Sequence, residues 1–197
     1  IDFRPIAQEM QRNAPDEVNF VHEGRASEEL ARILGARDDV VIPKIHWHLS
    51  TRRVLTMDYL DGIKITDIPA LDAAGVRSAE VAHTLVDLFN TMILKHGMFH
   101  ADPHPGNVLV LGTRDTPVIG MIDLGMVGRL SPRMRDLTVD IMVGAVRKDY
   151  EGIADAMYQL GTPTRKIDME AYRAEVALLA EKYLGKKLKD IELSAMI

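Results

Sequence analysis

Cysteine is absent from the 197 residues of this sequence. Its absence excludes disulfide bonds, thiolate nucleophiles and cysteine-based zinc sites, and it fits a reducing compartment. Long apolar runs are also lacking, since none approaches the ~18 residues that a membrane-spanning helix needs. No basic and then apolar secretory leader follows Ile1. We therefore expect a chain that is cytoplasmic or peripheral to a membrane, without a transmembrane segment of its own.

Excess positive charge is missing too. The chain has 24 Lys and Arg against 29 Asp and Glu, a net charge of −5, and the basic residues are scattered among the acidic ones. Clustered positive charge is what binds a nucleic-acid backbone, so no nucleic-acid partner is predicted. With 47% hydrophobic and 27% charged residues, the chain has enough apolar material for a sizeable core.

The first third of the chain combines one helical pattern with two extended ones. Apolar residues at steps of three and four predict a helix from Asp16 to Leu34, which carries Glu23. The β-rich runs Val40–Leu49 and Val54–Leu60 predict an antiparallel pair of strands joined by a short turn. Trp47, which falls in the first run, is expected to be a packing or surface residue.

The rest of the chain is mainly helical around one hairpin. A long helix is predicted from Arg77 to His96, with Ser78 as N-cap and Gly97 as C-cap. Two apolar strands, Val108–Leu111 and Val118–Ile122, predict a hairpin. Three further helices are expected at Pro132–Lys148, Tyr150–Leu160 and Asp168–Leu184. This order of elements predicts an α+β fold.

Candidate catalytic residues lie around that hairpin. In residues 100–107, HADPHPGN, an acid and an amide have the D-x-x-x-x-N spacing of a kinase catalytic loop. Asp102 would accept the proton of an attacking hydroxyl or orient a water, and Asn107 would turn its amide oxygen toward a metal. Asp123, after the second strand, would bridge magnesium to phosphates, and Gly125 would let the backbone turn sharply beyond it.

The two histidines of this loop allow another interpretation. A His-x-Asp-x-His pattern, here His100 to His104, supplies metal ligands in some hydrolases. Pro103 and Pro105 fix the backbone on either side of His104, however, which suits a rigid loop better than a ligand strand, and no further His pair follows. Both histidines are therefore predicted to support the loop, His100 through hydrogen bonds.

At these residues the sequence resembles the UbiB family, also called the ADCK family, of atypical protein-kinase-like proteins linked to ubiquinone and other isoprenoid-lipid metabolism. The resemblance runs from Glu17 to about Lys148. Its most specific parts are EVNFVHEGRASEELARI (17–33), STRRVLTMDYLDG (50–62), FHADPHPGN (99–107) and IDLGMVGRL (122–130). It implies a protein-kinase-like fold with ATP and Mg²⁺ as cofactors.

Site residues follow from the resemblance position by position. It makes Asp102 the catalytic-loop aspartate, and it makes Asn107 and Asp123 the magnesium ligands. It makes Glu23 the helix glutamate that pairs with the nucleotide-binding lysine. Around the adenine it implies a gatekeeper and a hinge, which would be Met57 and the segment Asp58 to Leu60. Plain core packing is the alternative role for Met57 and Leu60.

The sequence departs from the family's pattern in two ways. Glu17 matches the first acid of the family's Glu-x-Asp element, but Asn19 replaces the second, so the element has lost one of its two carboxylates. No Lys precedes Lys44 and no Gly precedes Gly24, so the phosphate-binding lysine, the small-residue loop and the family's Lys-x-Gly-Gln helix are missing. Truncation, degeneration or omission of the lobe would each explain this. We favour truncation, because all three catalytic-loop and metal residues are kept.

The predicted organisation is an α+β, protein-kinase-like fold with an incomplete N-lobe. Residues 1–61 would be the remnant of that lobe, with its αC-type helix and two strands, and residues 62–197 a mostly helical C-lobe. The predicted function is that of an ATP- and magnesium-binding atypical kinase or ATPase supporting ubiquinone or related isoprenoid-lipid metabolism. Poor turnover is expected of this chain alone, because Glu23 lacks its cation and the phosphates lack a cover.

Two other functions remain as alternatives. A small-molecule phosphotransferase of the aminoglycoside or choline type has a similar loop, but Ala101 replaces its glycine here. A non-catalytic scaffold would use the helices after Pro132 to bind a partner or a lipid surface. Nucleotide is the partner that separates the enzymes from the scaffold. Lipid or membrane contact is expected through parts outside this chain, and neither the substrate nor a protein partner can be read from the sequence.

Overall fold

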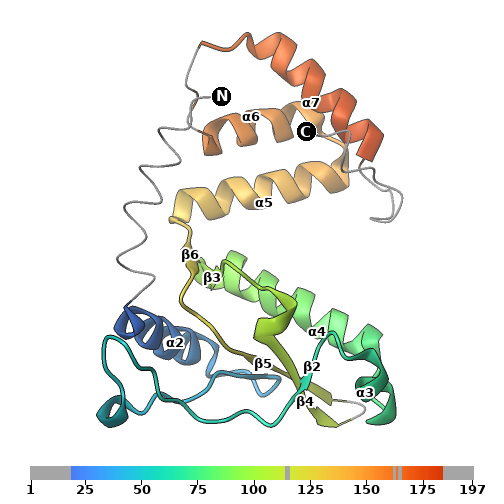
Figure 1. The fold of residues 1–197 in the computed structure, drawn as a ribbon. Helices are drawn as coiled ribbons and strands as arrows, with labels where there is room; N and C mark the ends of the chain where they lie inside the picture. Colours follow the sequence, from blue (N-terminus) through green and yellow to red (C-terminus); the bar gives the residue numbers. More distant parts are fainter. Residues whose placement is uncertain (1–18, 114–115, 162, 164–165, 184–197) are drawn as a thin grey trace. The chain divides into compact units, whose positions relative to one another are not determined.

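Figure 1 shows the computed structural model of the chain, which describes residues 19–113, 116–161, 163 and 166–183. The chain forms two compact units, residues 1–129 and residues 130–197. The predicted lobe boundary after residue 61 is a different division and stays a prediction. Glu17 and the predicted helix start at Asp16 lie outside the described residues.

A four-stranded sheet with the order β1-β5-β4-β2 forms the centre of the first unit. Strands β4 and β5 are an antiparallel hairpin in which Val110 lies opposite Ile119. Strand β2 joins β4 antiparallel, and β1 joins β5 parallel. The strands are β1 Val40–Val41, β2 Ile63–Lys64, β4 Val108–Thr113 and β5 Thr116–Met121. The hairpin predicted from the sequence is thereby confirmed.

A second, two-stranded sheet pairs β3, Met98–His100, with β6, Val127–Arg129. The pairing is antiparallel, and Phe99 lies opposite Gly128. Strand β3 leads into the predicted catalytic loop, and β6 follows the Asp-Leu-Gly segment. The small sheet therefore brings the two chemistry-bearing segments together although they are separated by the hairpin.

The helices of the first unit are α2 Phe20–Leu34, α3 Ile68–Ala73 and α4 Ser78–Asn90. The predicted long helix is confirmed to Asn90 and continues as a π-helical turn, Thr91–His96, which Gly97 ends with a left-handed φ of 65°. Helix α4 buries Val81 and Leu88 in the core. The predicted N-cap was wrong by one residue, since Arg77 holds that position. The short helix α3 was not predicted.

The predicted strand pair before Asp61 is only partly formed. Strand β1 stops at Val41, because Pro43 has no N–H to donate to a ladder, and a 3₁₀ turn occupies Trp47–Leu49. The two runs do lie antiparallel at one isolated bridge, which joins Ile45 to Met57. The pairing direction was therefore right and the extent of the strands was wrong.

Three helices make up the described part of the second unit: α5 Pro132–Arg147, α6 Tyr150–Leu160 and α7 Met169–Tyr183. The side chains of Ser131 and Asp149 cap α5 and α6 by accepting backbone N–H groups. Ile153, Ala154 and Val176 form the small core between α6 and α7. All three predicted helices are confirmed to within a residue or two. None of the described helices is long and apolar enough to cross a membrane.

Candidate active site

The predicted catalytic loop is fixed by its own backbone. The amide of His104 donates to the carbonyl of Asp102 at 2.7 Å, and the amide of Asn107 donates to the carbonyl of His104 at 2.8 Å. The ring Nδ1 of His104 accepts the Gly106 amide at 3.1 Å and so caps the 3₁₀ turn at Pro105–Asn107. With its ring used in this way, His104 lies in the loop as a brace, and the exposed Asp102 carboxylate is held on a rigid turn.

Asn107 connects this loop to the end of the hairpin. Its side-chain Nδ2 donates to the carbonyl of Asp102 at 3.4 Å, and its own carbonyl accepts the amide of Ile122 at 3.0 Å. Because the amide nitrogen is turned to Asp102, the amide oxygen is the atom of Asn107 left to act as a metal ligand. Ile122 immediately precedes Asp123, so this backbone hydrogen bond ties Asn107 to the residue next to the other predicted magnesium ligand.

Asp123 has an unusual backbone. Its φ is 56°, and the only other residue with a positive φ that is not glycine in the described part of the chain is Lys148, which caps a helix. The left-handed region is uncommon for residues with a Cβ, is tolerated best by Asn and Asp, and recurs at functional sites. Leu124 is 1% exposed and anchors the turn in the core, which leaves the Asp123 carboxylate in solvent.

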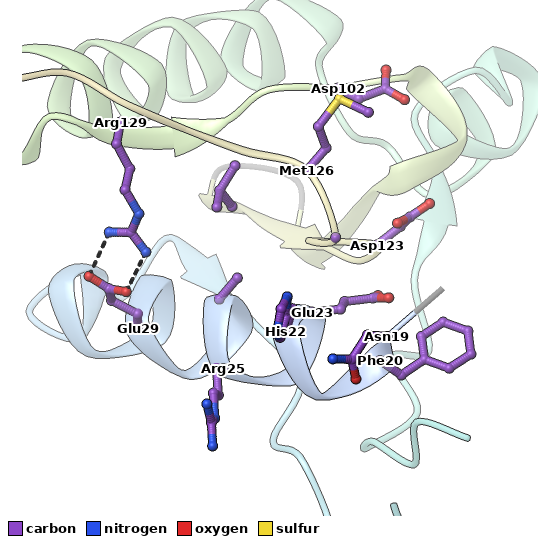
Figure 2. A pocket seen from close by; sticks show the side chains of 13 residues that line it. Asn19, Phe20, His22, Glu23, Arg25, Glu29, Asp102, Asp123, Met126 and Arg129 are labelled. Atoms are coloured by element: carbon purple, nitrogen blue, oxygen red, sulfur yellow. Dashed lines mark hydrogen bonds and ion pairs between the residues drawn. The ribbon is translucent and has the colours of Figure 1, made fainter. Parts of the chain in front are cut away.

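Glu23 faces Asp123 from helix α2 (Figure 2). A methyl group placed on Gly125 would stand 3.6 Å from Asp123 Oδ1 and 3.6 Å from Glu23 Oε2, so both carboxylates flank Gly125. Burial raises the pKa of Glu23 above its ordinary value, and the negative charge of Asp123 raises it further. Two carboxylates in this arrangement would be stabilised by a cation beside them.

Two pockets meet at this pair of carboxylates. The smaller, of about 410 Å³, brings together Met57, Asp58 and Leu60 of the predicted hinge. The larger, of about 680 Å³, is open to solvent and includes Asp102. Glu23 and Asp123 line both. The other residues of the smaller pocket are Tyr59, Leu109 and Ile122, and those of the larger include Gly125, Met126, Val127 and several side chains of α2.

Three predicted site residues, His100, His104 and Asn107, line neither pocket. His100 is 1% exposed, and its Nδ1 lies 3.4 Å from the carbonyl of Met126, so it braces the loop against the segment after Asp123. Among the described residues, no three His, Asp or Glu side chains are placed so that together they could hold a metal ion. The alternative of a histidine-based metal centre therefore has no ligand set within them.

The contacts that hold α2 were not predicted from the sequence. Arg129 on β6 forms a bidentate ion pair with Glu29, at 2.7 and 2.9 Å (Figure 2). The indole of Trp47, predicted only as a packing or surface residue, donates to Glu28 at 2.7 Å. Both pairs join residues far apart in the chain, so no local spacing could have revealed them.

Comparison with known proteins identifies relatives of this chain. The family described as the ABC1 atypical kinase-like domain matches residues 1–157. Protein ACTIVITY OF BC1 COMPLEX KINASE 8, chloroplastic, of Arabidopsis thaliana is 37% identical over 172 residues, which are 87% of this chain and 22% of that protein. AarF domain-containing protein kinase 1 of Gallus gallus is 32% identical over 162 residues, 81% of this chain and 31% of that protein. The chain thus spans a third or less of the length of these relatives.

A solved structure has a similar fold. Rv3197 of Mycobacterium tuberculosis, determined as a complex with erythromycin, superposes with a TM-score of 0.61 over 93% of this chain and 45% of that one. The two sequences are 19% identical, so the likeness concerns the fold alone. Together with the match to the kinase-like domain, it confirms the predicted protein-kinase-like α+β fold.

Proposed function

The chain belongs to the ABC1 atypical kinase-like family, and from this premise we propose that its site binds ATP with Mg²⁺ for phosphotransfer or hydrolysis. The observation that carries the proposal is the meeting of two pockets at Glu23 and Asp123. One pocket has the hinge residues a nucleotide base would need, and the other contains Asp102, the residue proposed to act on the acceptor. The phosphates would lie between them, at the two carboxylates.

The smaller pocket is suited to the adenine ring. Met57 and Leu60 give it apolar walls. The amide of Asp58 already donates to the carbonyl of Lys44 at 3.0 Å, and the Asp58 carboxylate lies 2.7 Å from Nε2 of His46. Held in this way, the segment from Asp58 to Leu60 can offer its remaining backbone groups to the base. Adenine recognition by a hinge backbone is the role proposed for this segment.

Asn107 and Asp123 would hold the magnesium ion. An amide oxygen and a carboxylate are hard oxygen ligands, which Mg²⁺ prefers, and the ion keeps room for phosphate oxygens and water. When bound, Mg²⁺ neutralises charge on the phosphates. Asp102 would accept the proton of an attacking hydroxyl or orient a water, as the residue at the exposed end of the braced loop. Glu23 would add negative charge beside the metal.

The wider role is proposed by family relationship. As part of a longer protein, this domain would support ubiquinone or related isoprenoid-lipid metabolism, at a membrane surface reached through other parts of that protein. One similar protein is named chloroplastic. The 197-residue chain alone would turn over ATP poorly, because no lysine precedes Lys44 to hold the phosphates.

Thermal unfolding with ATP and Mg²⁺, beside an Asp123→Asn variant, tests the proposal. A ligand that binds only the folded state raises the melting temperature, so the parent chain should gain a magnesium-dependent shift. Asparagine tolerates a left-handed φ, so the variant keeps its turn while losing the charge, and the shift should disappear. Asp38→Asn, at an exposed position away from the site, should keep it. No shift in the parent chain, or an equal shift in Asp123→Asn, would refute the proposal.

A further inference from the structure

The segment from His46 to Val54 lies along one side of helix α2. The carbonyl of Arg52 accepts the amide of Phe20 at the start of the helix, at 3.1 Å. One turn later, Gly24 faces the ring of Trp47. A further turn along, Glu28 accepts the indole N–H of the same Trp47 at 2.7 Å. Residues at intervals of four share one face of a helix, so the segment contacts a continuous stripe of α2.

The closest of these contacts is between Trp47 and Gly24. A Cβ placed on Gly24 would stand 2.6 Å from Cη2 of Trp47 and 3.1 Å from Cζ2. Non-bonded carbon atoms ordinarily stay about 3.5–4 Å apart, so any side chain at position 24 would force the ring and the helix to separate. The hydrogen bond to Glu28 holds the ring against moving away. Glycine therefore lets the ring set how closely α2 approaches this segment.

Glu23 precedes Gly24 and lies on the neighbouring face of the helix, where it faces Asp123 (Figure 2). A helix is stiff over one turn, so a displacement of the backbone at Gly24 displaces the carboxylate of Glu23 with it. On another face of the helix, Glu29 forms an ion pair with Arg129. This ion pair resists rotation of α2 when the backbone at Gly24 is displaced. The position of the Trp47 ring is thus transmitted to the site.

We propose that Trp47 is a positioning residue for Glu23: through its contact with Gly24 and its hydrogen bond to Glu28, it sets the distance of the Glu23 carboxylate from Asp123. The part of this proposal that concerns nucleotide affinity rests on the proposed function. The geometric part does not. A side chain that only filled a gap would need no hydrogen bond, whereas the indole of Trp47 donates one to Glu28.

Nuclear magnetic resonance of the 197-residue chain tests the geometric part without any ligand. The amide resonance of Gly125 reports on the site, because Glu23 and Asp123 flank it and Trp47 does not contact it. Glu23→Gln measures how far this resonance moves when the carboxylate is changed. Gly24→Ala and Trp47→Leu should each move it, and the double variant should move it part of the way back, because the shorter leucine removes the clash at 2.6 Å and leaves only Leu55 Cδ1, at 3.2 Å, close to the alanine methyl. Leu49→Ala, at an exposed position of the same 3₁₀ turn, should leave it in place.

Affinity for ATP with Mg²⁺ is the second readout. Moving a unit charge from about 4 to about 5 Å from a cation costs about fourfold in affinity at an effective dielectric constant of about 20. Gly24→Ala should therefore change the affinity about fourfold, and the double variant should bring it back toward the parent value.

The outcomes separate the two proposals. A folded Gly24→Ala whose Gly125 resonance is unmoved, or is moved equally by Leu49→Ala, overturns the role of Trp47. Should Gly24→Ala fail to fold, Trp47→Leu decides by the same resonance. If the parent chain binds no ATP, the proposed function fails, and the resonances still decide whether Trp47 positions Glu23.

Discussion

The two sides of the site are built by different kinds of contact. The floor, residues 101–107 and 122–125, is held by backbone hydrogen bonds, some within the loop and others from the loop to the segment around Asp123. The wall, helix α2 with Glu23, is held by the core and by side chains from distant parts of the chain. Those distant side chains are Trp47, which reaches Glu28, and Arg129, which reaches Glu29.

This difference separates what is rigid from what can be tuned. Backbone hydrogen bonds are kept by almost any side chain, so the placement of Asp102 and Asp123 tolerates sequence change around them. The wall depends on a few ion pairs and ring contacts, each of which a single substitution removes. Substitutions in the wall should therefore change the geometry of the site by small amounts. Substitutions in the core beneath the floor should instead lower the stability of the fold.

Leu124→Ala removes part of the core beneath the floor and should have the largest effect on stability. The side chain is 1% exposed in the main core, and its truncation should lower the free energy of unfolding by about 3 kcal/mol. Urea unfolding followed by the fluorescence of Trp47, the single tryptophan, measures this in the first unit. Leu49→Ala, 56% exposed, should change it by less than about 0.5 kcal/mol. Similar losses of unfolding free energy in both variants would contradict the view that the core beneath the floor supports the fold.

Arg37→Ala releases the far end of the wall. Just after α2, the guanidinium donates to Asp39, and also to Asp87 at 2.8 Å and Thr91 at 3.0 Å, which ties this end to α4. The hydrogen bonds that it donates to Asp39 and Asp87 hold the pKa of Arg37 above the ordinary value, so the charge persists at every pH of interest.

We expect Arg37→Ala to lower the free energy of unfolding by about 2 kcal/mol, because it removes several charged hydrogen bonds at once. The same urea titration measures it, with the exposed Arg53→Ala as control. A loss no greater than that of Arg53→Ala would show that Arg37 does not secure the helix.

Arg129→Ala and Glu29→Ala remove the ion pair on another face of α2. Both side chains are partly exposed, at 56% and 36%, so their coupling should be only about 0.5 kcal/mol despite the bidentate geometry. A double-mutant cycle at low salt measures the coupling, and added salt should reduce it. A coupling that is unchanged by salt would mean that the contact is not mainly electrostatic.

Glu23→Gln changes a side chain of the wall that faces the floor. Its effect on stability should be the smallest of these predictions. Because the folded chain raises the pKa of Glu23 above the ordinary 4.5, the folded state binds this proton more tightly than the unfolded state does. Stability from this group is therefore present below pH 4.5 and falls as pH rises through the folded pKa.

Without ligand, Glu23→Gln should gain melting temperature relative to the parent chain as pH increases from 4.5 to neutrality. Thermal unfolding at a series of pH values measures the difference, and Asp72→Asn, at an exposed position on α3, should show none. A difference that shrinks with increasing pH would mean that the carboxylate is stabilised in the ligand-free chain.

The floor could be predicted from the sequence because its determinants are local. The spacing of Asp102 and Asn107, the two apolar runs after them and Asp123 at the end of the second run describe a loop, a hairpin and a turn. The hairpin and the kinase-like fold are confirmed. The catalytic and metal-binding roles of these residues stay predictions, since no comparison or contact tests them.

The wall could be predicted only as a helix. Its face toward Trp47 depends on how an irregular segment folds back, and the sequence predicted that segment as part of a strand. The segment departs from the predicted strand at Pro43 and the 3₁₀ turn Trp47–Leu49. These bring Trp47 over Gly24, where a strand would have paired it in a β-ladder. The predicted pocket residues Met57, Asp58 and Leu60 do gather in one pocket, which the spacing alone did not require.

The parallel pairing of β1 with β5 has a consequence for the order of folding. The hairpin β4–β5 closes between near neighbours, whereas β1 can pair only after the chain from Val40 to Ile119 has closed into a loop. Closing a long loop costs entropy before its contacts repay it, so distant pairings form late. Since β1 follows α2 directly, the helix that carries Glu23 would dock onto a hairpin already made. During folding, Asp102 and Asp123 would therefore reach their positions before helix α2 docks and brings Glu23 beside them.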